Sequence, residues 1–168
     1  TINMFECMTP NAFHKDNYYS TRDFATGSHT ETTLGMNQIT WRVCYRGIGR
    51  CNNVIEKVPD IVMDEKLKNR IIGEAKFLRA FYYWKMNAVF HGVPLILSSP
   101  NLEKDASLPR NSYEEVRNQI IKDLDEALPV LETKYSRADD GRATKGAALA
   151  LKAKVLLQDL DYAGTKAA

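Results

Sequence analysis

The sequence predicts an all-α protein built from helical hairpins. From residue 38 onward, apolar residues recur every three or four positions over long stretches, which is the period of amphipathic helices. Proline and glycine residues divide this pattern into segments of helical length. Residues 9–37 instead mix polar residues without a sustained period. We therefore expect two parts, an irregular loop segment over residues 1–37 and a helical core over residues 38–168.

The first predicted hairpin joins helices over residues 38–57 and 66–90. Pro59 ends the first helix, and Gly92 and Pro94 supply the left-handed stop and the break after the second. The stripe of the first helix consists of Trp41, Cys44, Ile48, Cys51 and Ile55. The second helix has two apolar stripes and is expected to be buried on two sides; they are Ile71, Ala75, Leu78, Tyr82 and Val89, and Phe77, Phe81, Trp84 and Ala88. Both tryptophans are therefore assigned to the core.

The second predicted hairpin joins helices over residues 112–129 and 144–158. "SYEE" is a capping box in which Ser112 and Glu115 fix the helix start. Its stripe consists of Val116, Ile120, Leu124, Ala127 and Leu131. The last helix carries a face of small residues, Gly146, Ala150 and Ala153, which is suited to close helix pairing.

The order of elements predicts a stack of helical hairpins. "LLQDLDYAGTKA", residues 156–167, is similar to the junction between successive tetratricopeptide repeats, with a new helix starting at Tyr162. The hairpin loops at 91–111 and 131–141 are longer than the strict repeat of about 34 residues allows. We therefore expect a divergent, tetratricopeptide-like helical solenoid.

Composition and motifs argue against several classes of protein. Basic and acidic residues number 23 and 21 and are interspersed, so nucleic acid is not an expected partner. No apolar run approaches the roughly 20 residues of a membrane span. His14, His29 and His91 lack metal-binding spacing, and the three cysteines form no C-x-x-C pair.

Catalytic patterns are also missing from the sequence. No serine lies in a G-x-S-x-G elbow, and the G-x-G at Gly47 and Gly49 lies in a helical pattern, where it suits packing. Asp123 is expected on a solvated helix face, and Glu74 with Arg79 is expected to form a half-buried pair. The chain is therefore not predicted to be an enzyme or to hold a metal or cofactor.

Four strings resemble, in this order, the SusD/RagB family of outer-membrane nutrient-binding lipoproteins. They are "WRVCYRGIGRCNNVIEKVP", "GEAKFLRAFYYWKMNAVFHGVPLIL", "LPRNSYEEVRNQIIKDLDEALPVL" and "GRATKGAALALKAKVLLQ". The resemblance implies a surface-exposed lipoprotein of Bacteroidetes-type bacteria that binds a glycan or oligosaccharide, or in some members a peptide. It also implies a SusC-type TonB-dependent transporter as partner in nutrient uptake, and binding without catalysis.

The same resemblance implies that this chain is a fragment truncated at both ends. Members of the family are several times longer and carry a lipoprotein signal and an anchoring cysteine. Cys7, in "MFECMT", lacks the small apolar residues expected before a lipidated cysteine. The outer-membrane anchor is therefore expected to lie outside this chain.

The candidate ligand site is the irregular segment "NAFHKDNYYSTRDFATGSH". Aromatic rings stack on the C–H faces of sugars, while the forked donors of Arg or the acceptors of Asp and Asn match pairs of sugar hydroxyls. The candidate residues are Tyr18, Tyr19, Arg22, Asp23, Phe24 and His29. In the alternative interpretation, the aromatic residues only pin the segment to the helices.

A second hypothesis comes from a different class of protein. A tetratricopeptide-type adaptor would use the same helices to bind a peptide or protein partner along their concave surface. Its ligand would contact the inner helices and not the loop at 9–37, and it would need no residues beyond a terminal capping helix.

Overall fold

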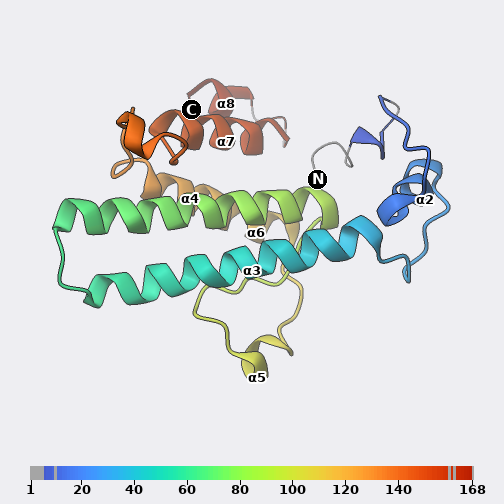
Figure 1. The fold of residues 1–168 in the computed structure, drawn as a ribbon, viewed down its shortest axis with the longest axis horizontal. Coiled ribbons are helices and arrows are strands. Elements are labelled where there is room, and N and C mark those ends of the chain that lie inside the picture. Colours follow the sequence, from blue (N-terminus) through green and yellow to red (C-terminus); the bar gives the residue numbers. More distant parts are fainter. Residues whose placement is uncertain (1–5, 10, 159, 161, 168) are drawn as a thin grey trace. The chain divides into compact units, whose positions relative to one another are not determined.

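The computed structural model describes residues 6–9, 11–158, 160 and 162–167, and these residues form helices and loops without any strand (Figure 1). This confirms the all-α prediction. The elements are η1 Tyr18–Ser20, α2 Thr21–Thr26, α3 Gly35–Lys57, η2 Val58–Asp60, α4 Glu65–Phe90, α5 Leu102–Asp105, α6 Tyr113–Ala127, η3 Arg137–Asp139, α7 Lys145–Gln158 and α8 Tyr162–Ala167.

The chain divides into two compact units, Thr1–Val43 and Cys44–Ala168. The first unit contains η1, α2 and the first turns of α3, and the second contains the remaining helices. The predicted division after residue 37 stays a prediction. The predicted repeat junction includes residues 159 and 161, which lie outside the described part of the chain.

Local capping accounts for the helix boundaries. Ser112 Oγ accepts from the amide of Glu115, whose carboxylate accepts from the amide of Ser112 at 2.7 Å, which confirms the capping box. Asp64 caps α4 by accepting from the amide of Leu67. The left-handed residue that ends α4 is His91, with φ 53°, and Gly92 follows with φ 105°.

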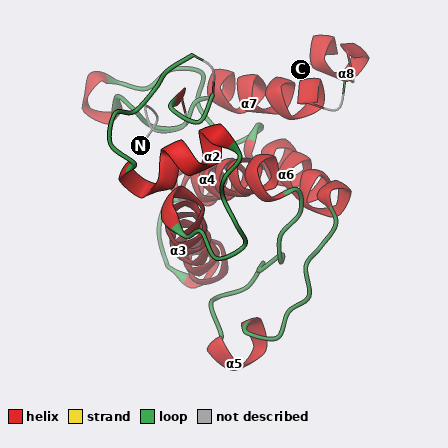
Figure 2. Ribbon diagram, turned by 90° about the vertical axis from the view of Figure 1, so that its right-hand side faces the viewer, coloured by secondary structure: helices red, strands yellow, loops and turns green. Residues whose placement is uncertain are grey.

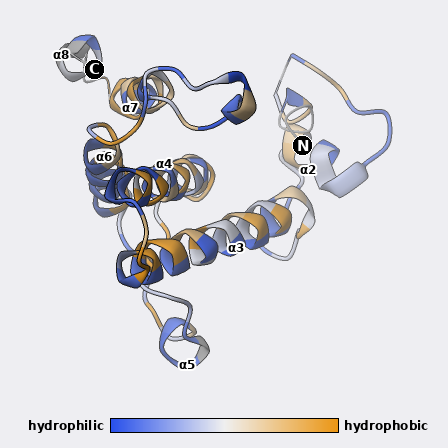
Figure 3. Ribbon diagram, turned by 60° about the vertical axis from the view of Figure 1, so that its left-hand side comes forward, coloured by the Kyte–Doolittle hydropathy of each residue, from blue (hydrophilic) through white to orange (hydrophobic). Residues whose placement is uncertain are grey.

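The core of the Cys44–Ala168 unit lies where α4 packs against α6, α7 and the later turns of α3 (Figure 2). The predicted α6 stripe is confirmed because all five of its residues are buried. On α3, Cys44, Ile48 and Cys51 are buried as predicted, whereas Trp41 is 41% exposed and is not a core residue. Figure 3 shows hydrophobic and hydrophilic residues alternating along α3, as expected of an amphipathic helix.

The predicted stripes of α4 are partly confirmed, since Ala75 is buried, and partly wrong. The residues of α4 that are buried are Gly73, Ala75, Arg79, Ala80, Tyr83, Met86 and Asn87. Phe77, Tyr82 and Trp84 pack partly buried against this core, while Leu78, Phe81 and Val89 are exposed. The prediction misplaced the exposed residues because the buried line contains Arg79 and Asn87, which an apolar pattern passes over.

Glycines allow close contacts with α4 at two positions. A Cβ at Gly47 would overlap the ring of Tyr82 on α4, and one at Gly73 would overlap the side chain of Val130. The prediction that Gly47 serves packing is therefore confirmed. Gly146 and Ala150 of α7 are exposed, so the predicted pairing across this small face is not made by the described residues. Within the part of the chain that the structure describes, no helix is long and apolar enough to cross a membrane.

Candidate functional site

Two exposed tyrosines mark the predicted site in the Thr1–Val43 unit. The ring centroids of Tyr18 and Tyr19 lie 4.2 Å apart with the planes tilted by 59°. The His14 ring is nearly parallel to that of Tyr18 at 6.3 Å. Because Tyr18 is 53% and Tyr19 39% exposed, both rings retain open surface. The result is a small aromatic platform, defined by His14, Tyr18 and Tyr19.

The backbone of this platform is strained. Tyr19 and Ser20 both adopt the left-handed conformation, with φ 53° and 56°, and neither is glycine. Such residues cost about 1–2 kcal/mol each and persist only when tertiary contacts hold them. The buried Thr21 donates its hydroxyl to the carbonyl of Tyr18 at 3.1 Å, and the backbone of Gly35 lies so close to Tyr19 that a Cβ there would overlap it. The two rings are therefore presented by a fixed turn.

The remaining predicted residues follow directly in α2 and the turn after it. Asn17 joins them, because its amide donates to Asp23 Oδ2 at 2.7 Å and its oxygen accepts from the amide of Arg22 at 3.1 Å. Phe24 pairs with His29 at 4.9 Å between ring centroids. The six predicted residues thus share one short segment and form two aromatic pairs.

Sequence reasoning missed His14 and Asn17. His14 precedes Tyr18 by four residues, and Asn17 directly precedes the tyrosines. A polar residue just before a short helix is a common turn signal that could have pointed to Asn17. Nothing in the local sequence indicated the position of the His14 ring.

The two tyrosine hydroxyls of the platform interact, with Tyr18 donating to Tyr19 at 3.5 Å. The hydrogen bond and charge interaction with Tyr19 raise the pKa of the exposed Tyr18 above its usual value of 10.0. The Tyr18 hydroxyl is therefore protonated at neutral pH and can donate to or accept from a ligand. Among the residues the structure describes, no group of three His, Cys, Asp or Glu side chains could hold a metal ion.

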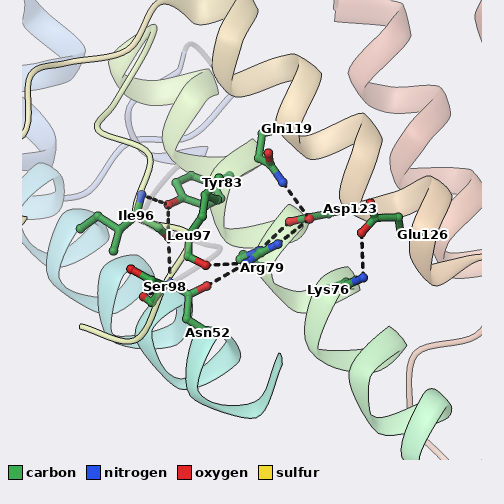
Figure 4. A network of polar contacts seen from close by, with 10 residues as sticks. All are labelled: Asn52, Lys76, Arg79, Tyr83, Ile96, Leu97, Ser98, Gln119, Asp123 and Glu126. Carbon is green, nitrogen blue, oxygen red and sulfur yellow. Dashed lines mark hydrogen bonds and ion pairs between the residues drawn. The ribbon is translucent and has the colours of Figure 1, made fainter. Parts of the chain in front are cut away.

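A buried polar network occupies the centre of the Cys44–Ala168 unit (Figure 4). Arg79 Nε and Nη2 donate to the two carboxylate oxygens of Asp123 at 2.8 and 2.7 Å. The guanidinium also donates to Asn52 Oδ1 at 2.9 Å, and Gln119 donates to Asp123 Oδ1 at 2.9 Å. Burial alone would lower the pKa of Arg79, but the hydrogen bonds and charge of Asp123 outweigh it and raise the pKa. The guanidinium is therefore charged, and its two parallel hydrogen bonds to Asp123 are those of a guanidinium–carboxylate pair.

This network corrects two expectations. Asp123 is fully buried and is not on a solvated face. Arg79 pairs with Asp123, whereas Glu74 pairs with Arg142 at 2.9 Å. Asp123 follows Ile120 by three residues and precedes Ala127 by four, so its position on the α6 stripe was the signal that could have found it.

The network also holds the chain that follows α4. Asn52 donates to the carbonyls of Ile96 and Ser98, each at 2.8 Å. The hydroxyl of Tyr83 donates to the carbonyl of Ile96 and accepts from its amide at 2.7 Å. The loop that carries α5 then stands away from the helices (Figure 1). At its far end Arg110 donates to the carbonyl of Gly92 at 3.0 Å, so the loop is fixed at both ends.

Comparison with known proteins identifies the family. Residues 1–157 match the SusD-like family described as "Starch-binding associating with outer membrane". The chain belongs to the SusD-like family. A SusD-like protein of Formosa agariphila is 31% identical over 161 residues, which are 89% of this chain and 30% of the relative. A second one from the same organism is 29% identical over 124 residues, 73% of this chain and 24% of the relative.

The same family appears among solved structures. A laminarin-binding SusD-like protein superposes on 92% of this SusD-like chain with a TM-score of 0.85 and 30% identity. The chain covers 33% of that structure. The predicted family and the tetratricopeptide-like fold are thus confirmed. The SusD-like chain spans about a quarter to a third of the length of these relatives.

Proposed function

We propose that this chain is part of a non-catalytic, surface-exposed protein that binds a glycan or oligosaccharide for uptake. Family membership supports this function, since the family is described as starch-binding and one related structure is a laminarin-binding protein. The observation that carries the proposal is the pair of exposed tyrosines held by a strained turn, because strained backbone gathers at ligand-binding positions.

The chemistry of the segment fits a sugar. The open faces of Tyr18 and Tyr19 offer apolar surface on which sugar C–H groups can stack. Arg22, Asp23 and His29 would add donors and acceptors for hydroxyl groups, and Phe24 would support the ring of His29. Tyr18 is more than half exposed, which favours this role over the alternative in which it pins the segment.

Native affinity electrophoresis of the complete protein tests the proposal. Gels would contain laminarin, starch and other neutral polysaccharides, and the protein would be compared with the double variant Tyr18→Ala, Tyr19→Ala. We expect one polysaccharide to retard the parent, and the variant to lose about 1–3 kcal/mol of binding, an estimate taken from ring stacking on nucleic-acid bases. The double variant Tyr18→Phe, Tyr19→Phe is the matched control, because it keeps both rings and removes only the hydroxyls.

The outcomes separate function from site. Retardation that persists in the alanine variant, with circular dichroism unchanged, would place the site elsewhere while keeping the function. No retardation by any polysaccharide would move support to the peptide-binding alternative, in which an adaptor binds along the helices.

We further propose that the complete protein is a lipoprotein at the cell surface and that its partner is a SusC-type TonB-dependent transporter. The family description, which places these proteins at the outer membrane, supports the location. Affinity purification from detergent-solubilised outer membranes provides the test. Recovery of the protein without any TonB-dependent transporter would contradict the partnership.

A further inference from the structure

A pocket of about 400 Å³ opens in the Cys44–Ala168 unit between the start of α4, the turn after α6 and the start of α7. Its size lies within the range of small-ligand sites. The side chains that matter for its chemistry are Lys66, Asn69, Val130, Glu132 and Lys145. The aromatic platform belongs to the other unit, so this pocket is a separate candidate site.

The walls of the pocket are fixed by contacts between its elements. Val130 packs so closely on α4 that only glycine fits at Gly73. The amide of Lys145 donates to the carbonyl of Glu132 at 3.0 Å, which ties α7 to the turn after α6. The pocket therefore does not depend on a mobile loop for its shape.

Within the described part of the chain, the pocket holds two ammonium groups and one carboxylate, and only one ammonium forms an ion pair with it. Lys66 Nζ pairs with Glu132 Oε1 at 2.9 Å, and their side chains are 83% and 38% exposed. The hydrogen bond and charge of Lys66 lower the pKa of Glu132, and the charges of Lys145 and Arg70 act in the same direction. Lys145 itself makes no ion pair with any residue the structure describes. An external anion would therefore meet two ammonium groups and one carboxylate.

We propose that this pocket binds an acidic sugar unit, a uronate, through its carboxylate. The inference rests on the proposed glycan binding and names one class of sugar. Lys145 and Lys66 would donate to the carboxylate, which accepts charge-assisted hydrogen bonds from both. Because Lys66 is largely exposed, it can turn from Glu132 to the ligand at little cost. Asn69 would bind a hydroxyl, and the apolar side chain of Val130 would contact the sugar ring.

Calorimetric titration of the complete protein with an oligogalacturonate and with its methyl ester tests this inference. The two probes share their sugars and differ in the carboxylate charge. We expect the acid to bind more tightly than the ester, and its affinity to fall with added salt. Lys145→Ala should weaken binding of the acid about three- to fivefold, whereas Glu132→Gln should strengthen it by a similar factor. Lys122→Ala, an equal change of charge at an exposed position of α6, should leave it unchanged.

The inference requires Lys145→Ala and Glu132→Gln to change the affinity for the acid in opposite directions. A structural role for the pocket would make Lys145→Ala and Glu132→Gln weaken binding alike, and that result would overturn the inference. Equal affinities for the acid and the ester would overturn it too. If neutral polysaccharides bind and the oligogalacturonate does not, this inference fails while the proposed function stands. If neither binds, both fail.

Discussion

Replacing Asp123 by asparagine should strongly destabilise the fold. The carboxylate is fully buried and accepts two hydrogen bonds from the guanidinium of Arg79 and one from Gln119. Asparagine keeps the volume but removes the charge and turns one acceptor into a donor. At about 1.5–3 kcal/mol for each charge-assisted bond, the two bonds from Arg79 account for about 3–6 kcal/mol. Removing one partner of a buried pair typically costs about 3–5 kcal/mol, in agreement with this sum.

A double variant separates the cost of leaving one buried charge unpaired from the cost of removing the whole ion pair. The double change Arg79→Met, Asp123→Leu removes both charges and leaves only neutral partners, such as the carbonyl oxygen of Asn52, without a donor. Its cost should be about 1–3 kcal/mol, so the double variant should be more stable than the single one.

Urea unfolding of the complete protein, followed by far-ultraviolet circular dichroism, gives the free energies. Hydrogen exchange at the amide of Ile96, which donates to Tyr83 beside the network, gives a local readout. If the free energy of unfolding of Asp123→Asn lay within about 1 kcal/mol of the parent's, the reasoning would be refuted. A protein that buries a guanidinium without its carboxylate should lose more stability than that. A double variant less stable than the single one would refute it equally.

Two further predictions concern helix packing and capping. Gly47→Ala should destabilise the protein by about 1–3 kcal/mol in urea unfolding because its methyl group overlaps the ring of Tyr82. Gly146→Ala should be neutral or stabilising, because its methyl group would meet only Thr144 Oγ1, at an ordinary contact distance of 3.9 Å. Ser112→Ala should cost about 1 kcal/mol. Hydrogen bonds from Ser112 lower the pKa of Glu115, so the capping contribution is present above the unfolded value of 4.5 and is lost as the pH falls through the folded value. The free energies of unfolding of Glu115→Gln and of the parent, measured at pH 7 and pH 3, check this prediction. A difference in stability between the two proteins that persists at pH 3 would contradict it.

Helix positions could be read from the sequence because they depend on local signals. The helix predicted at 66–90 is observed at Glu65–Phe90, and the capping box at Ser112 sets the start of α6. Period and capping act within a few residues of the chain, so neither requires knowledge of the partner helices.

The buried face of α4 could not be read in the same way. Its centre is occupied by Arg79, whose burial depends on Asp123, 44 residues later, and on Asn52, 27 residues earlier. A hydropathy pattern treats each of these as a surface residue. Only the joint placement of all three on otherwise apolar stripes indicates that they meet.

The candidate site was predictable in its chemistry and not in its geometry. The composition of the segment pointed to Tyr18 and Tyr19, and the structure presents both rings at the surface. Their arrangement depends on left-handed backbone at Tyr19 and Ser20, a conformation for which the sequence supplies no glycine. The contact that accommodates it comes from Gly35, 16 residues after Tyr19.

These two departures from local rules have a common physical basis. The left-handed turn at Tyr19 and the buried charge at Arg79 are each unfavourable alone, and each is held by contacts from distant parts of the chain. Both fix the course of an irregular segment, the aromatic platform in one unit and the loop after Ser98 in the other. Natural sequences tolerate such local conflict mainly where a segment must be held in one conformation. We therefore expect loss of either holding contact to disturb the segment it fixes before it disturbs the helices.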